Sequence, residues 1–325
     1  MNKIQPPHWH PVQCAGFILD WDGVLADTKL DFSEIRSKYF QGRPVPLLEG
    51  MAMFSEKEKS ELWHDIYELE MNGAEQATPV QYAMDFVEWL NQKSIPWVVV
   101  SRNCGDSIRL AAKKINFPLP DKVFCRDAGP VKPDPKALWL AAKELNLEAQ
   151  QCAMVGDYVY DLVGARRAGM RALLVQRPQA DWRHWADAVF PTMKDLLEAL
   201  QSPLPLIPWE YTSLVEQKGE RWLIKAWLLS LQIPDDAPDI GSLCEEAARL
   251  GAGSLVISPS VSLSPAQWKN WPGLSPVYLG MEQGAVIREV LKKRFPLISI
   301  REGTDGVLLS GVPHLVEREM EALLK

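Results

Sequence analysis

The sequence predicts an α/β protein with two domains, and two patterns carry this prediction. In the first 201 residues, short apolar runs alternate with segments of helical periodicity. This alternation is typical of a parallel sheet that helices cover on both faces. A proline-rich stretch follows at 202–208, and the alternation resumes in a smaller unit at 209–325. A chain of 325 residues also suits two domains of about 150 residues each.

The expected strands of the first domain are apolar runs bounded by turn residues. They lie at 14–19, 95–101, 122–125, 152–155, 172–175 and 188–190. Helices are expected between them, at about 31–40, 56–71, 80–91, 106–115, 136–145, 157–168 and 193–200. Ser55 with Glu58, and Thr78 with Gln81, have the spacing of capping boxes, and Asn72 with Gly73 is typical of a helix end.

Polar side chains follow three of these strands at the point where each strand ends. Asp20, Ser101 and Asp157 come directly after apolar runs, and Lys132 lies in the loop after a further strand. In open parallel sheets, ligands bind outside the carboxyl ends of the strands. Any one of the four is explained as an ordinary loop residue, but together they predict a site at one sheet edge.

Asp20 and Asp22 are separated only by Trp21 and are followed by Gly23. Carboxylates at the tip of a buried strand need a partner, because an unpaired buried charge is costly. A bound cation supplies that partner. A strand-end turn accounts for the same residues, since Asp and Gly are common in turns. This stretch alone leaves both interpretations open.

The residue types at this edge fit phosphoryl transfer. Asp20 can act as a carboxylate nucleophile that forms an aspartyl-phosphate, and Asp22 can protonate the leaving group and then deprotonate water. Ser101 offers a hydroxyl and backbone N–H groups to a phosphoryl oxygen, while Lys132 offers a positive charge. Asp157 is expected to hold Mg²⁺ together with Asp20.

Asp161 lies one helical turn beyond Asp157, so both side chains are expected on the same helix face. Asp161 either ligates the metal through water or orients Lys132. A simpler alternative is an acidic residue at a helix N-terminus, where the helix dipole favours it.

Four segments in this order resemble the motifs of the haloacid dehalogenase superfamily. They are 20–28, the strand that ends at Ser101, 132–135, and 156–161; the segment 165–170 resembles the phosphoglycolate-phosphatase-like branch. The resemblance covers about 12–201. It implies a Rossmann-like core, a Mg²⁺-dependent phosphatase mechanism, a short helical cap at about 28–77, and a metal contact from the backbone carbonyl of Asp22.

This chain departs from the family pattern at two positions. Trp21 replaces a smaller apolar residue, and Arg102 stands where Asn commonly follows the serine. Arg102 either adds a charge near the phosphate or points to solvent. The family resemblance also implies that Asp22 favours phosphate esters, because a leaving halide needs no proton. Caps select substrates in this family, and the cap cations Arg36, Lys38 and Arg43 are candidate contacts, with solvated helix charge as the simpler explanation.

The second domain resembles no family that we recognise. Strands are expected at 222–229, 254–258, 277–280, 297–300 and 306–309, and helices at 240–250, 265–271, 282–295 and 313–325. Three roles stay open for it: covering the phosphatase site, binding a regulator, or forming an oligomer.

Composition excludes several classes of protein. The net charge is −7 and neither domain is basic, which argues against nucleic-acid binding. No apolar run approaches the ~18 residues that span a bilayer, and the polar first 11 residues do not resemble a secretory signal. The five cysteines are scattered and form no Cys-x-x-Cys pair, which favours a reducing cytoplasm.

The sequence therefore predicts a cytoplasmic Mg²⁺-dependent phosphatase that hydrolyses a small phosphorylated metabolite through an aspartyl-phosphate. Two alternatives remain. One is a phosphomutase that uses the same residues. The other is a ligand-sensing regulatory protein with a weakly active core.

Overall fold

The computed structural model describes residues 4–325. The chain forms two compact units, one of Pro11–Pro203 and one of Leu204–Lys325 together with the described residues up to His10. No helix among residues 4–325 is both long and apolar enough to cross a membrane.

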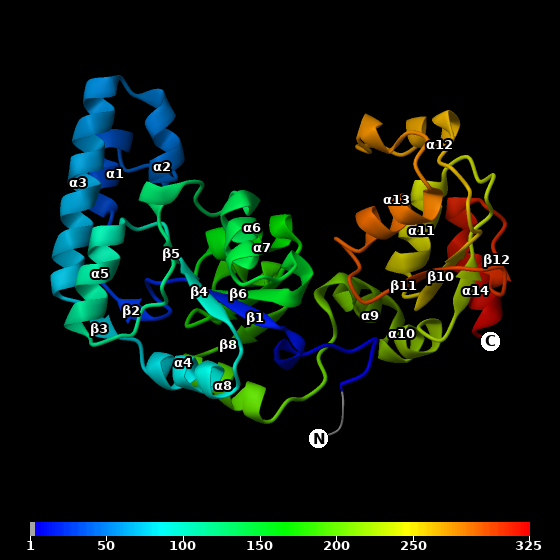
Figure 1. The fold of residues 1–325 in the computed structure, drawn as a ribbon, viewed down its shortest axis with the longest axis horizontal. Coiled ribbons are helices and arrows are strands. Elements are labelled where there is room, and N and C mark those ends of the chain that lie inside the picture. Colours follow the sequence, from blue (N-terminus) through cyan, green and yellow to red (C-terminus); the bar gives the residue numbers. More distant parts are fainter. Residues whose placement is uncertain (1–3) are drawn as a thin grey trace. The chain divides into compact units, whose positions relative to one another are not determined.

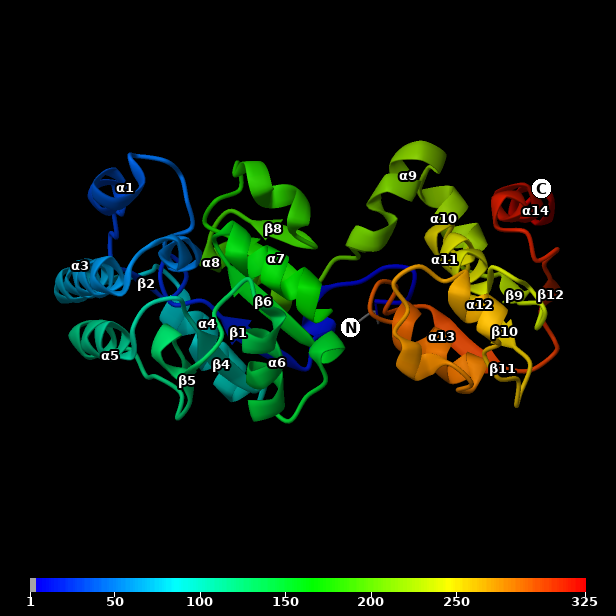
Figure 2. The ribbon, with the colours of Figure 1, turned by 90° about the horizontal axis from the view of Figure 1, so that it is seen from above.

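The first unit contains a six-stranded sheet in the order β5-β4-β1-β6-β7-β8 (Figures 1 and 2). All five strand pairings are parallel. The strands are β1 (Gly16–Leu19), β4 (Trp97–Val100), β5 (Val123–Phe124), β6 (Cys152–Gly156), β7 (Arg171–Val175) and β8 (Ala188–Phe190). Residues of β1, β6 and β7 are buried on both faces, which explains why these strands read as continuous apolar runs.

Helices cover both faces of this sheet. They are α4 (Ala83–Gln92), α5 (Gly105–Lys114), α6 (Pro135–Glu144), α7 (Val159–Ala168) and α8 (Met193–Gln201). Ile18 and Met154 pack with α6 and α7 on one face, whereas Phe17 meets Phe86 of α4 edge to face on the other. The predicted parallel α/β core is confirmed.

A helical cap is inserted between β1 and β4. It comprises α1 (Ser33–Phe40), α2 (Leu47–Gly50) and α3 (Glu56–Glu75), and the strands β2 (Ala26–Asp27) and β3 (Thr78–Pro79) pair antiparallel at its base. The Ser55–Glu58 capping box forms as predicted. The predicted helix end at Asn72 and Gly73 is wrong, because α3 continues to Glu75, and Gly73 instead permits close packing on the Thr28 carbonyl. The second predicted box does not form, since Thr78 belongs to β3.

The second unit has a four-stranded parallel sheet in the order β11-β10-β9-β12. Its strands are β9 (Ser230–Gln232), β10 (Ser254–Ile257), β11 (Ser299–Glu302) and β12 (Val307–Leu308). Its helices are α9 (Thr212–Lys218), α10 (Glu220–Ala226), α11 (Ile240–Arg249), α12 (Pro265–Lys269), α13 (Gln283–Leu291) and α14 (Val316–Leu323). The predicted second α/β domain is thus confirmed.

Two expectations for this unit are wrong in detail. The apolar run at 222–229 was expected to be a strand, but most of it lies in α10, which buries Leu223 and Ala226 on one side. The strand expected at 277–280 is replaced by a 3₁₀ turn, Pro276–Tyr278. Short apolar runs do not distinguish a strand from a buried helix, which explains both errors.

Candidate active site

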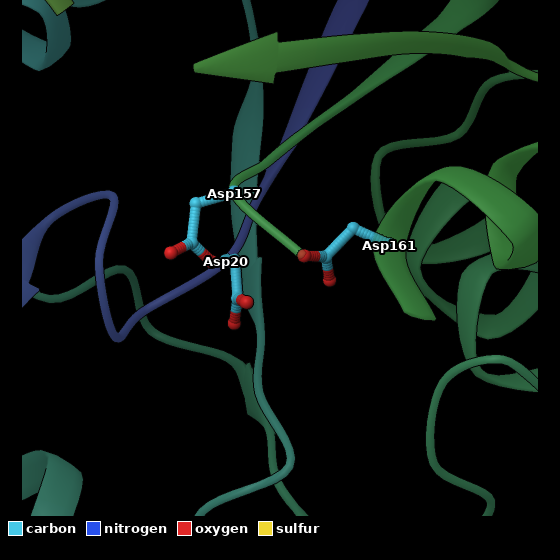
Figure 3. Close-up of side chains that lie close together, drawn as sticks. All are labelled: Asp20, Asp157 and Asp161. Atoms are coloured by element: carbon cyan, nitrogen blue, oxygen red, sulfur yellow. The ribbon is translucent and has the colours of Figure 1, made fainter. Parts of the chain in front are cut away.

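Asp20 and Asp157 protrude from neighbouring strands at the same edge of the first sheet. Leu19 of β1 is in register with Val155 of β6, so the residues that follow both strands emerge together. The backbone N–H of Asp20 donates to the Val155 carbonyl at 2.9 Å, which fixes the point where the two chains separate. The carboxylates point into a common space beside Asp161 (Figure 3).

Asp161 joins these two carboxylates from the first turn of α7. One ligand oxygen from each of Asp20, Asp157 and Asp161 lies within 4.8 Å of the others. Two glycines make this approach feasible. A Cβ at Gly23, whose φ is +76°, would come 2.4 Å from Asp157 Oδ2, and a Cβ at Gly156 would come 2.2 Å from that of Asp161.

Lys132 lies between two members of this cluster. Its Nζ is 2.8 Å from Asp20 Oδ1 and 2.7 Å from Asp161 Oδ1, and its side chain is only 1% exposed. Burial alone would lower the pKa of Lys132, but the two carboxylates outweigh burial and raise it. The two carboxylates therefore favour the charged form of the lysine, and Asp161 contacts Lys132 directly.

The cluster nevertheless carries excess negative charge. Burial and the Asp161 carboxylate raise the pKa of Asp157 to about 6, even though Arg177 Nε donates to Asp157 Oδ2 at 2.8 Å. Burial, and then Asp161, also raise the pKa of Asp20 well above its usual value against the opposing effect of Lys132. Three crowded carboxylate donors suit a hard divalent cation such as Mg²⁺, which prefers oxygen ligands.

Asp22 lies outside this cluster but lines the same cavity. Its Oδ1 accepts hydrogen bonds from the backbone N–H of Thr28, at 3.0 Å, and from the Thr28 hydroxyl. Burial raises the pKa of Asp22, and the bonds from Thr28 oppose this shift. A carboxyl held in this way sits at the cavity wall with one oxygen fixed by Thr28.

Ser101 and its neighbours contribute from the end of β4. Ser101 is buried, lines the cavity, and accepts a hydrogen bond from the Asn103 N–H at 3.1 Å. The Arg102 side chain is mostly buried, and its charge is paired. It is held by Glu49 of the cap at 2.8 Å, stacks over Tyr160 at 4.2 Å, and donates to the Lys132 carbonyl.

The cavity at this edge has a volume of about 340 Å³. This is at the small end of the ~300–1,000 Å³ typical of ligand pockets. The core contributes Asp20, Asp22, Ser101 and Asp157, and the cap contributes an apolar wall that includes Leu47 and Ile66. Of the three cap cations that the sequence singled out, Arg36 lines the cavity, while Lys38 pairs with Asp65 at 2.6 Å.

Trp21 does not line this cavity. It is fully buried in the core, where its ring meets Phe117 edge to face. The bulky residue between the two acids is therefore accommodated by core packing behind them.

Three residues of the cavity were missed by sequence reasoning. Arg177 and Glu70 line the cavity, and Glu70 forms a buried ion pair with Arg126, whereas Glu49 acts there through its ion pair with the cavity-lining Arg102. Arg177 comes two residues after β7, so the rule that found Asp20 and Asp157 would have reached it. The two glutamates carry no local signal, because their partners lie on distant segments.

The chain is similar to several known proteins. Residues 14–169 match the haloacid dehalogenase-like hydrolase family. Hexitol phosphatase A of Escherichia coli is 25% identical over 184 residues, which cover 51% of this chain and 85% of that protein. An uncharacterised hydrolase of Saccharomyces cerevisiae is 29% identical over 126 residues, covering 38% and 57% of the two chains. The crystal structure of a hydrolase from Pseudomonas syringae superposes with a TM-score of 0.50 at 19% identity, covering 58% of this chain and 98% of that one.

Residues 14–169 of the first domain therefore match the haloacid dehalogenase-like hydrolase family, as the order of the four motifs predicts. The P. syringae structure supports the same α/β fold.

Proposed function

We propose that the first domain is a Mg²⁺-dependent phosphatase that hydrolyses a small phosphorylated metabolite through an aspartyl-phosphate. The observation that carries this proposal is a cluster of four charged side chains at the carboxyl ends of the adjacent parallel strands β1 and β6. Its members are Asp20, Asp157, Asp161 and Lys132. The similarity to hexitol phosphatase A supports the reaction type. The small cavity volume fits a small substrate.

In this mechanism Asp20 attacks the phosphorus atom and the bond to the leaving oxygen breaks. Asp22 delivers a proton to that oxygen and then accepts a proton from the water that hydrolyses the acyl phosphate. The raised pKa of Asp22 suits a group that must hold a proton before it gives one away. Ser101 and Lys132 bind the phosphoryl oxygens and counter their charge.

The residues present fit a bound Mg²⁺. Asp20 and Asp157 would hold it directly, with the Asp22 carbonyl, and Asp161 would act through water while it orients Lys132. When bound, the cation would neutralise charge on the phosphoryl oxygens and weaken their electrostatic repulsion of the Asp20 carboxylate. Lys132 opposes the rise in the pKa of Asp20 and holds its Oδ1 at 2.8 Å.

A phosphate-release assay over a panel of phosphorylated metabolites, with and without Mg²⁺, tests the proposal. We expect Asp20→Asn to reduce turnover by about 10⁴-fold or more, because the nucleophile is lost. Asp27→Asn is the matched control, since Asp27 is an exposed carboxylate in the same segment that does not line the cavity. Activity that survives Asp20→Asn would remove the nucleophile assignment, and phosphate transfer to a second sugar without release would identify a phosphomutase.

The cytoplasmic location and assembly through the second domain remain predictions. All five cysteines are free, as a reducing compartment requires.

A further inference from the structure

The second domain has a groove of its own, about 360 Å³ in volume, where α9 and α10 meet the end of α14. Its lining includes Lys218, Arg221, Trp222 and Lys225 of the first two helices, and Glu321 and Leu324 on the α14 side. Cations therefore outnumber carboxylates among the described residues of this groove, although the whole chain has a net charge of −7. The proposed function uses none of these residues.

Two of the cations, Arg221 and Lys225, have no carboxylate partner among residues 4–325. Arg221 is exposed and makes no hydrogen bond or ion pair with those residues, and Lys225 donates to a neutral group, the Leu324 carbonyl, at 3.0 Å. Lys218 differs, because two glutamates of α14 neutralise it. The groove thus presents two uncompensated positive charges.

Arg221 and Lys225 lie one helical turn apart on α10, so their side chains project from the same face. Like charges with this spacing repel each other and destabilise a helix. A dianion bound between the two side chains would remove that repulsion. A phosphate monoester carries a charge of about −1.5 to −2 at pH 7, which matches the charge of the pair. The arginine also offers a planar fork of N–H donors that fits two phosphate oxygens.

Apolar surface lies next to this cation pair. Trp222 follows Arg221 in α10, is partly buried, and lines the groove together with Leu324. Its indole N–H donates to the Leu250 carbonyl at 3.0 Å, and Lys218 Nζ lies 4.7 Å from the centre of its ring, so the ring is held in place. A ligand with an apolar group beside its phosphate would gain from covering this surface.

We infer that this groove binds a small organic phosphate, with the phosphate group between Arg221 and Lys225 and the apolar part against Trp222 and Leu324. Of the three roles that the sequence left open for the second domain, this inference corresponds to ligand binding. It does not depend on the proposed function, because the groove and the aspartate cluster belong to different units of the chain.

NMR titration of the full-length protein tests the inference, with the tryptophan indole N–H signals as the readout and Trp222→Phe to assign the Trp222 signal. The probes are inorganic phosphate and phenylphosphonate, whose C–P bond cannot be hydrolysed as a phosphate ester. We expect both probes to shift the Trp222 signal saturably. Phenylphosphonate should bind roughly threefold to tenfold more tightly, because its ring covers apolar surface.

Replacing the cation pair should remove most of this binding. In the double variant Arg221→Gln with Lys225→Gln, we expect the affinity that the Trp222 signal reports to fall about tenfold or more, the scale of a lost charge-assisted hydrogen bond. Arg318→Gln with Lys269→Gln is the matched control. These are exposed cations of the same domain that do not line the groove, and their replacement changes the net charge equally.

Three outcomes would contradict the inference. A Trp222 signal that ignores both probes, or that responds equally to chloride at the same ionic strength, would mean that the groove is no anion site. Equal weakening in the control variant would assign the effect to the overall charge of the protein. Equal affinity for phosphate and phenylphosphonate would overturn the organic ligand, because the apolar surface would then contribute nothing.

Discussion

Each domain contains a lysine placed between two carboxylates, and the two arrangements differ mainly in their access to water. Lys132 bridges Asp20 and Asp161 in the first domain, whereas Lys218 of α9 bridges Glu317 and Glu321 of α14 in the second. The side chain of Lys132 is 1% exposed, and that of Lys218 is 22% exposed with carboxylates that are nearly half exposed. The pKa of both lysines is raised.

The difference shows why only one arrangement points to chemistry. Around Lys218, water solvates whatever charge the ion pairs leave over, so the contact serves to join two helices. Around Lys132, Asp157 adds a third buried carboxylate that the lysine does not reach. Excess buried charge of this kind is typical of functional sites, and under the proposed function a bound cation would offset it.

The charged residues that follow the strands also differ between the two domains. In the second domain, the connection from β11 to β12 packs closely against the sheet: a Cβ at Gly306 would come 2.7 Å from the Gln232 nitrogen and 3.0 Å from the Val256 side chain. The charged pair there, Arg301 with Asp305, satisfies itself at 2.6 Å. Among residues 4–325, the cluster of Asp20, Asp157 and Asp161 is the one acidic group with metal-ligand spacing.

Replacing Lys132 is the most severe test of this comparison. Lys132→Met leaves three buried carboxylates without their lysine, so we expect the metal-free protein to lose about 3–5 kcal/mol in its free energy of unfolding. We expect kcat to fall by about 10²–10³-fold, as when one preorganised donor to the reacting group is removed. Denaturant unfolding with and without Mg²⁺, together with the phosphate-release assay, measures both effects.

Added Mg²⁺ should restore part of the stability that Lys132→Met loses, because the dication replaces the missing positive charge. The variant's unfolding free energy should therefore depend on Mg²⁺ more strongly than that of the wild type. Unchanged stability in the absence of metal would mean that the excess charge inferred around Lys132 does not exist.

A smaller effect is expected at Arg177, the second cation of the cluster. Its guanidinium is half exposed and contacts the same carboxylate, Asp157, that is proposed to bind the metal. Arg177→Met should tighten Mg²⁺ binding roughly threefold to tenfold, since about 1 kcal/mol of charge repulsion in water is removed. Calorimetric titration measures this, with Arg183→Met as the control because Arg183 is exposed and donates only to Gln179. Weaker binding would show that Arg177 orients Asp157 instead of competing with the cation.

How far the sequence predicts the molecule depends on whether the signal is local. Asp20, Ser101 and Asp157 could be found because strand ends in a parallel sheet converge whatever the rest of the chain does. The partner of Arg102 could not, because Glu49 is 53 residues away on the cap and only the folded chain brings them together. In the second domain, the strand β9 begins at the polar Ser230, just after an apolar run that is mostly helical. A prediction based on apolar residues therefore placed the strand on the preceding helix.

We expect the smallest change in stability at Lys218, where water reaches the lysine and both of its carboxylate partners. Lys218→Met removes the lysine between Glu317 and Glu321, yet we expect the free energy of unfolding to change by less than about 1 kcal/mol, because water takes over the solvation of both carboxylates. Raised salt should weaken the wild-type contact and shrink even this difference. Phosphate release should not change, since Lys218 lies in the other domain from the aspartate cluster. A loss as large as that of Lys132→Met would show that a lysine between two carboxylates stabilises this protein regardless of burial, and the contrast between the two domains would then lose its physical basis.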